Sequence, residues 1–262
     1  MKYRKIIAIL ISVVILTFMA NKVFLAQEAA ITSQKFAEPL TSTSIWLDAK
    51  EKTSFAEEMD KVYEKALADG AIKSGSREAI DLLMERATFA KDEAQQEEIR
   101  QELTQYGTYI YEAKEVAWPS CNISGDITLY TPMVFYQAWE KTWTLTCAGN
   151  WESTSWRKRV FIGDVGDDDA FGVKYSDSMQ AYRSSVVRVS AYLADEDTEK
   201  KVTTYNRSDG DGSKGFSFRL QDYTYFVPFK TEYVGYKWYG SCTYDSEFGS
   251  YDGVATAYYD PT

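Results

Sequence analysis

Residues 142–147 read Thr-Trp-Thr-Leu-Thr-Cys, a strict alternation of threonine with large apolar side chains. Successive side chains of a β-strand point to opposite faces, so this run predicts a strand with one buried face and threonines on the other. Comparable runs, alternating or rich in strand-forming residues, follow at 127–130, 156–162, 187–193, 202–205, 216–220, 223–229, 234–242 and 254–259. About nine short strands separated by polar turns predict an antiparallel β-sandwich over residues 117–262.

A different period, of three and four residues, runs through residues 51–116. Thr53 or Ser54 is suited to cap a first helix, because its side-chain oxygen can accept a hydrogen bond from a first-turn amide, and Gly70 ends that helix. Four apolar residues of this helix fall on one face: Phe55, Met59, Val62 and Ala66. The spacing predicts an amphipathic helix with this stripe against a neighbour.

Ser76 is the expected cap of a second helix, whose apolar stripe continues toward the end of the segment. The stripe comprises Ile80, Leu83, Ala87, Ala90, Ala94, Ile99, Leu103, Tyr106 and Ile110. Pro119 cannot continue a helix, so helical structure ends before it. Residues 51–116 are therefore predicted to form an acidic helical hairpin that packs on itself or on the β region. A coiled coil with a partner protein is the alternative.

The N-terminus has a bacterial-type export pattern, with three basic residues among the first five and an apolar run over residues 6–20. Residues 1–26 are predicted to be a signal peptide or a retained membrane anchor, and residues 27–50 a flexible linker. Basic residues stay on the cytoplasmic side, so the rest of the chain is expected to be secreted or on the extracytoplasmic face of the membrane. The whole chain is predicted to be an α+β protein.

The net charge excludes one class of partner. The chain carries −10, and residues 1–26 hold four basic residues and no acidic one, so the remainder carries −14. Such a surface repels phosphate backbones, and nucleic-acid binding is not expected. Membrane contact is expected only through residues 1–26, if they are retained. The chain has no histidine, which removes the commonest general base and metal ligand.

Three cysteines, Cys121, Cys147 and Cys242, lie in the part expected to be exported, where a disulfide can persist. Cys147 lies mid-strand on the apolar face and can be matched with either of the other two. We expect one disulfide that includes Cys147 and one free thiol. The connectivity stays open, because three cysteines allow more than one pairing.

The loop at residues 163–169 is rich in carboxylates, with Asp164, Asp167, Asp168 and Asp169. Several carboxylates on one extracellular loop are suited to calcium, which makes the four aspartates a candidate site. Their spacing matches no defined calcium loop, so a solvated turn is the simpler interpretation. No other cofactor is expected.

Aromatic residues are concentrated in the β region, with six of seven tryptophans and fifteen of twenty tyrosines beyond residue 116. Rings occur at both parities of the run from Tyr233 to Tyr244, so they cannot all enter one core. Exposed flat rings stack on sugars or anchor protein interfaces. The expected binding rings are Trp151, Trp156, Tyr233, Tyr236, Trp238 and Tyr239.

Two classes of function follow. The first is a surface-displayed or secreted non-enzymatic binding module that recognises a glycan or a protein, and a bacteriocin-like effector shares its compartment and fold. The second is a carboxylate-dependent extracellular hydrolase, since glycoside hydrolysis needs only two carboxyl groups at a defined separation. No pair stands out in the linear sequence, so the first class is preferred and no catalytic residue is assigned.

Overall fold

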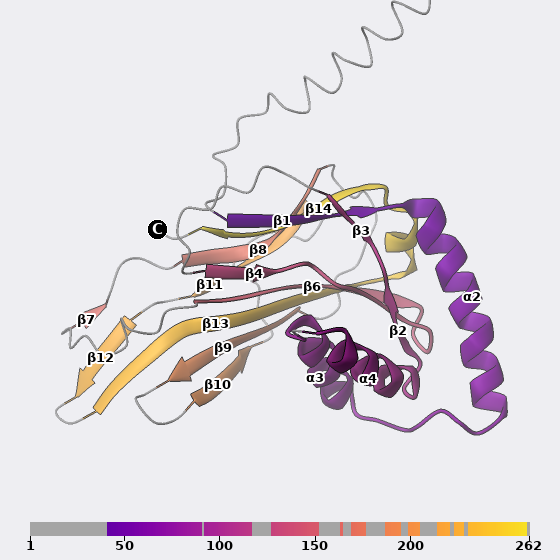
Figure 1. The fold of residues 1–262 in the computed structure, drawn as a ribbon, viewed down its shortest axis with the longest axis horizontal. Coiled ribbons are helices and arrows are strands. Elements are labelled where there is room, and N and C mark those ends of the chain that lie inside the picture. The colour runs from indigo at the N-terminus through magenta and orange to yellow at the C-terminus, as the bar shows by residue number, and fades with distance from the viewer. Residues whose placement is uncertain are drawn as a thin grey trace, which may run out of the picture. The chain divides into compact units, whose positions relative to one another are not determined.

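A computed structural model describes residues 41–90, 92–116, 127–151, 163–164, 169–176, 187–194, 199–204, 214–220, 223–227 and 230–260. By its internal contacts the chain divides after Glu38, and all described residues belong to the second unit, Pro39–Thr262. They form helices and two antiparallel sheets (Figure 1), which confirms the expected mixture of helix and antiparallel strand.

The smaller sheet has five strands in the order β11-β8-β14-β1-β3. Its strands are β1 (Thr41–Leu47), β3 (Lys114–Val116), β8 (Asp169–Tyr175), β11 (Gly215–Leu220) and β14 (Gly253–Asp260). All of β1 pairs with β14, from Thr41 opposite Tyr259 to Leu47 opposite Gly253. The predicted linker is therefore wrong from Thr41 onward, because pairing with the C-terminal strand makes this short polar run a strand between β14 and β3.

The larger sheet has nine strands, six of them on the path β10-β9-β13-β6-β5-β2. β4 pairs with β6, β12 pairs with β13, and β7 pairs with β12. The strands are β2 (Thr108–Tyr111), β4 (Ile127–Tyr130), β5 (Val134–Gln137), β6 (Thr142–Trp151), β7 (Gly163–Asp164), β9 (Val187–Ala194), β10 (Glu199–Thr204), β12 (Tyr223–Val227) and β13 (Lys230–Tyr244).

One apolar core joins the two sheets. It includes Ile45 from β1 and Phe171 from β8, together with Trp143, Leu145 and Trp238 from the larger sheet. Gly240 on β13 permits the closest approach, since a Cβ there would lie 2.4 Å from the Phe218 ring. Large rings from the two sheets thus interdigitate across a residue without a side chain.

The helices differ from the predicted hairpin. They are α2 (Ala49–Ala68), α3 (Arg77–Thr88) and α4 (Glu93–Thr104), with a short 3₁₀ helix η2 (Ser246–Ser250) before β14. Asp48, not Thr53 or Ser54, caps α2, whereas Ser76 caps α3 as expected. No helix among these described residues is long and apolar enough to span a membrane.

The second predicted helix is interrupted and ends early. Asp92 starts a new helix by accepting from the Gln95 amide, and Gly107 adopts a φ of 67°, which turns the chain out of the helix. Residues 108–111 and 114–116 are strands. The hairpin is therefore wrong at residues 89, 90 and 92, where the helix is interrupted. It is also wrong after Thr104, because residues 108–111 pair with β5 and residues 114–116 pair with β1.

The threonine face of β6 is also covered, contrary to the expectation of a half-buried strand. Thr144 and Thr146 are both fully buried. The Thr146 hydroxyl is 3.1 Å from the Thr88 hydroxyl of α3, and the Thr144 hydroxyl is 2.8 Å from that of Thr243. α3 and α4 lie on this face (Figure 1), so threonine here pairs with other hydroxyls instead of with water.

Candidate functional site

The two expected binding rings whose side chains are described lie in the core. Trp238 is 1% exposed and stacks on Tyr259, with ring centroids 4.4 Å apart. Tyr239 is 0% exposed, and Phe89 at the end of α3 is 6.3 Å from its ring. Their assignment to an exposed patch is wrong, because the strand is covered on both faces. The side chains of the other four, Trp151, Trp156, Tyr233 and Tyr236, lie outside the described part and stay a prediction.

The cysteines that can be located are free thiols. Cys147 and Cys242 are buried and form no disulfide, so the expected disulfide through Cys147 is wrong. Cys147 faces Gly240 across the ladder and Cys242 faces Leu145, which makes the two thiols diagonal neighbours. Diagonal neighbours lie about 7–8 Å apart, with a somewhat shorter separation between their Cβ atoms, whereas a disulfide needs Cβ atoms about 4 Å apart. Burial raises the pKa of the Cys147 thiol well above its usual value. Cys121 lies outside the described residues.

The acidic loop is only partly described. Asp164 and Asp169 belong to β7 and β8 by their backbones, whereas Asp167 and Asp168 and all four side chains lie outside the description. Within the described ranges, no three His, Cys, Asp or Glu side chains gather as metal ligands would. The calcium site stays a prediction.

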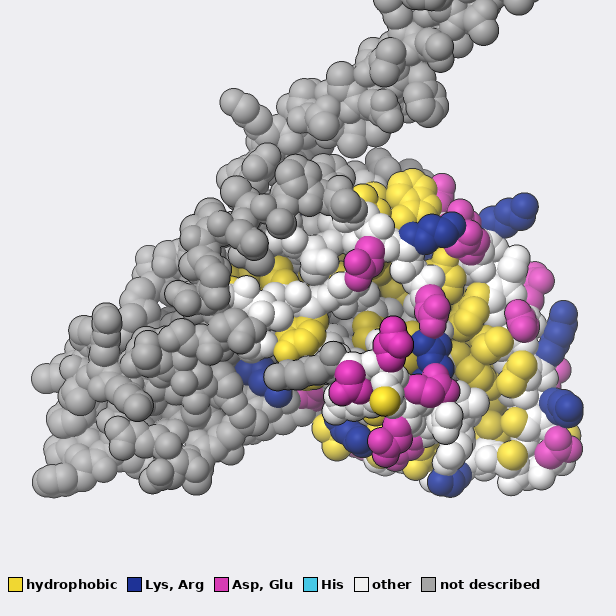
Figure 2. Space-filling view, in the orientation of Figure 1, with side chains coloured by type: hydrophobic (Ala, Val, Ile, Leu, Met, Phe, Trp, Pro, Cys, Tyr) yellow, Lys and Arg dark blue, Asp and Glu magenta, His cyan; other side chains and the backbone are white. Residues whose placement is uncertain are grey.

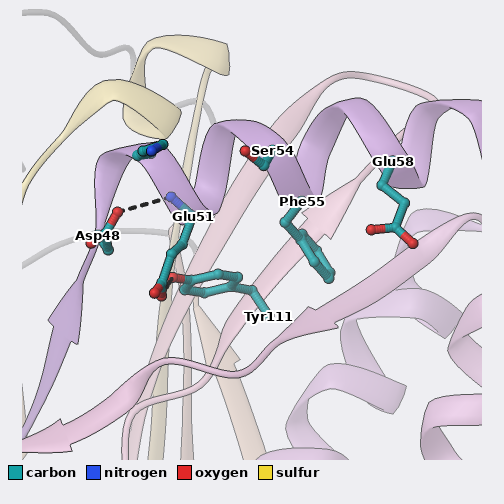
Figure 3. A pocket seen from close by; sticks show the side chains of 7 residues that line it. Asp48, Glu51, Ser54, Phe55, Glu58 and Tyr111 are labelled. Atoms are coloured by element: carbon teal, nitrogen blue, oxygen red, sulfur yellow. Dashed lines mark hydrogen bonds between the residues drawn. The ribbon is translucent and has the colours of Figure 1, made fainter.

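An open pocket lies along the first half of α2. It has a volume of about 490 Å³ and is lined by Asp48, Lys50, Glu51, Ser54, Phe55, Glu58 and Tyr111. Glu51, Phe55 and Glu58 project from the same side of the helix, and the Glu51 carboxylate lies beside Tyr111 (Figure 3). Two rings and three carboxylates therefore face one open space.

Each wall of the pocket is fixed by its neighbours. Asp48 accepts the Glu51 amide at 2.8 Å, which starts α2 and holds this carboxylate at the rim. The Phe55 and Tyr111 rings meet edge to face at 5.5 Å. Lys114 donates to Glu51 at 2.8 Å, and the Tyr111 hydroxyl donates to the same carboxylate at 3.4 Å. Burial, then the charges of Glu51 and Asp48, raise the pKa of Tyr111 to about 12, so its hydroxyl stays a donor.

An exposed tryptophan extends this surface. Trp46 on β1 is 38% exposed and lies directly opposite Lys114 of β3, whose amine reaches Glu51. Around α2, apolar side chains alternate on the surface with acidic and basic ones (Figure 2). Trp46 and the pocket are therefore linked through one ion pair. We call Trp46, Lys114 and the seven lining residues the α2 surface.

A buried lysine holds α2 against η2 and the residue that follows it. Lys52 is fully buried, and its Nζ donates to the carbonyls of Phe248 at 2.6 Å and Tyr251 at 2.9 Å. Its Nζ also lies 4.4 Å from the Phe248 ring centroid. Farther along the helix, the Tyr136 hydroxyl donates to Asp60 at 2.8 Å. Polar contacts thus set the position of the helix that carries the pocket.

The α2 surface was missed by sequence reasoning. Trp46 falls in the segment expected to be a linker, and the carboxylates of α2 are ordinary for an exposed helix face. Phe55 in the apolar stripe was the only available signal, and Tyr111 was assigned to the end of a helical segment.

The chain matches no known protein family, no curated protein and no solved structure.

Proposed function

We propose that this chain is an exported, non-enzymatic binding module that contacts its ligand through the α2 surface. The observation that carries the proposal is the open pocket in which Phe55 and Tyr111 form an aromatic floor beside three carboxylates. Rings with polar groups at their edges are the usual anchors of recognition surfaces.

Carboxylate-dependent hydrolysis fits the pocket less well. Among its three carboxylates, Asp48 is engaged by the Glu51 amide, which it accepts at 2.8 Å as the cap of α2. Glu51 is also engaged by Lys114 and Tyr111. Carboxylates that are already committed to other groups of the protein are poorly placed for hydrolysis, so recognition is the better account.

A basic protein segment is the favoured ligand. The pocket is lined by three carboxylates and one lysine, and the chain beyond residue 26 carries −14, which attracts cations over a distance. An ammonium or guanidinium group over Phe55 or Tyr111 would combine a cation–π contact with a carboxylate partner. A sugar would use the rings but not the charge.

The remaining expectations belong to the same proposal. We infer that the two sheets are the faces of a β-sandwich, that residues 1–26 direct export, and that Trp151, Trp156, Tyr233 and Tyr236 extend the recognition surface. Calcium at Asp164, Asp167, Asp168 and Asp169 would be structural. An exported module of this kind needs no histidine and no nucleic-acid contact.

The test uses a matched pair of substitutions on α2. Glu58 lines the pocket, whereas Glu57 is exposed on another side of the same helix. The purified protein is titrated with lysine-rich and glutamate-rich peptides and is applied to a neutral glycan array. We expect binding of the lysine-rich peptide alone, weakened several-fold by Glu58→Gln and unchanged by Glu57→Gln. Equal loss in both variants would mean nonspecific attraction. If the protein binds glycans and neither peptide, the ligand is a glycan and the proposal of a basic protein segment is wrong.

A further inference from the structure

Lys52 occupies an unusual place for a lysine. It lies in the first turn of α2, after the cap Asp48, and its side chain is fully buried. The N-terminal end of a helix carries a partial positive charge, which disfavours a cation there. Burial disfavours the charged amine further. Both effects disfavour the charged form of this amine.

The amine joins two parts of the chain nearly 200 residues apart. It donates to the carbonyls of Phe248 in η2 and Tyr251 just after it. Three rings surround it, with centroids 4.4 Å (Phe248), 5.7 Å (Tyr251) and 5.9 Å (Trp143) from Nζ. Lys52 is thus the central contact between α2 and residues 246–252.

Charged neighbours come from two of the packed elements. Asp48 on α2 and Asp252, between η2 and β14, both favour the protonated amine. The faces of the three rings, which include Trp143 of β6, favour it as well. Burial outweighs the two carboxylates and lowers the pKa of Lys52 from 10.5 to about 7. A solvated lysine keeps its proton up to its ordinary pKa, so protonation favours the undocked helix.

The same two turns of α2 carry the pocket. Asp48, Glu51 and Phe55 line it (Figure 3), and Lys52 belongs to the same stretch of the helix. If the first two turns of α2 move away from residues 246–252, the side chains of Asp48, Glu51 and Phe55 move with them. Docking by Lys52 is therefore a condition for the shape of the pocket.

We propose that Lys52 is a pH-sensitive clasp, which holds the first two turns of α2 on residues 246–252 when its amine is neutral and loosens them when the amine takes up a proton. The effect on ligand binding rests on the proposed function, whereas the clasp itself does not. Binding through the α2 surface would then strengthen as the external pH rises from neutral toward 9.

Hydrogen exchange of the full chain tests the clasp. The opening constant of amides 52–56, corrected for intrinsic exchange, should fall on the order of tens-fold from pH 6.5 to 9, since the undocked form binds the extra proton over most of that range. Lys61→Met, an exposed lysine on the same helix, should behave like wild type. Lys52→Met should remove the pH dependence.

A second measurement needs only the wild-type protein and therefore tests the clasp even if the Lys52→Met variant does not fold. The ¹³Cε resonance of Lys52 in the wild-type protein should titrate near pH 7, well apart from the exposed lysines. A wild-type opening constant that is flat with pH, a pH dependence that survives in Lys52→Met, or a Lys52 that titrates above 10 would overturn the clasp. If the clasp is found and peptide binding is not, the proposed function fails alone.

Discussion

α2 and the α3–α4 pair cover opposite faces of the β2–β5–β6 end of the larger sheet, and they are attached by different chemistry. Alternate residues of β2 pack on the two faces of the sheet. Tyr109 and Tyr111 belong to the core beside α2, whereas Ile110 belongs to the cluster under α3 and α4. The α3–α4 side is closed by apolar side chains such as Leu83 and Leu103. The α2 side also packs apolar side chains on the core, among them Phe55 and Met59, but it adds a buried amine and two tyrosine–carboxylate bonds.

This difference separates what pH can change from what it cannot. The side chains that close the α3–α4 cluster, among them Leu83, Ile99 and Leu103, do not titrate, so the stability that comes from their burial should be the same at neutral and alkaline pH. The α2 contact contains Lys52, whose proton affinity changes on docking. The following predictions test that contrast, from the largest effect to the smallest.

The largest effect is expected in the apolar contact. Leu103 of α4 is 0% exposed, so Leu103→Ala should lower the free energy of unfolding by about 2–5 kcal/mol through lost burial and a residual cavity. The cost should be the same at pH 6.5 and pH 9. Chemical denaturation at both pH values measures it.

Leu82→Ala is the matched control on α3. Leu82 is 47% exposed, so its truncation should change the free energy of unfolding by no more than about 0.5 kcal/mol. A similar cost for both variants would mean that the α3–α4 pair is not held by its buried face.

The second effect is the pH dependence of wild-type stability. Between pH 7 and pH 9 the unfolded chain keeps a proton on Lys52 that the folded protein has released. The free energy of unfolding should therefore rise with pH, by about 2–3 kcal/mol from this one group over two pH units. Lys52→Met should flatten the profile, and Leu103→Ala should shift it downward without changing its slope. A profile that falls over this range would contradict the assignment.

The same contrast explains what the sequence could predict. The three-and-four spacing correctly marked Ile80, Leu83, Ile99, Leu103 and Ile110 as buried, although Ile110 lies in a strand. The burial followed from local apolar spacing, but the secondary structure after Gly107 did not, because Gly107 and the pairing with β5 turn that segment into a sheet. The local apolar spacing was sufficient to predict which residues are buried under α3 and α4, but it was insufficient to predict that residues 108–111 form a strand.

No local pattern could reveal the α2 contact. The carbonyls that receive Lys52 belong to residues 248 and 251, and only the folded chain brings them to it. The argument from ring parity failed for a related reason. Trp238 and Tyr239 do face opposite ways, but the second sheet covers one and the end of α3 covers the other. The alternation of side chains along a strand shows which residues share a face of the sheet. It does not show whether other elements cover one face or both.

The third effect concerns the stronger tyrosine–carboxylate bond of α2. Tyr136→Phe removes a 2.8 Å bond to Asp60, which Lys141 also contacts at 3.2 Å. The loss should lower the free energy of unfolding by about 1–1.5 kcal/mol, because a hydrogen bond to a charged acceptor is stronger than a neutral one and water only partly replaces it. Chemical denaturation near pH 8 measures the cost, and an unchanged midpoint would show that this bond does not hold α2.

The smallest effect is expected at the other bond, Tyr111 to Glu51, which measures 3.4 Å. A bond this long is weak, and Glu51 keeps its 2.8 Å contact with Lys114 when the hydroxyl is removed. Tyr111→Phe should therefore cost less than about 0.5 kcal/mol of unfolding free energy and should leave the aromatic floor of the pocket in place. Measured beside Tyr136→Phe, it ranks the two bonds by their geometry. If Tyr111→Phe proves the costlier of the two, the first half of α2 is held at the pocket itself, and Glu51 would be a structural residue instead of part of a recognition surface.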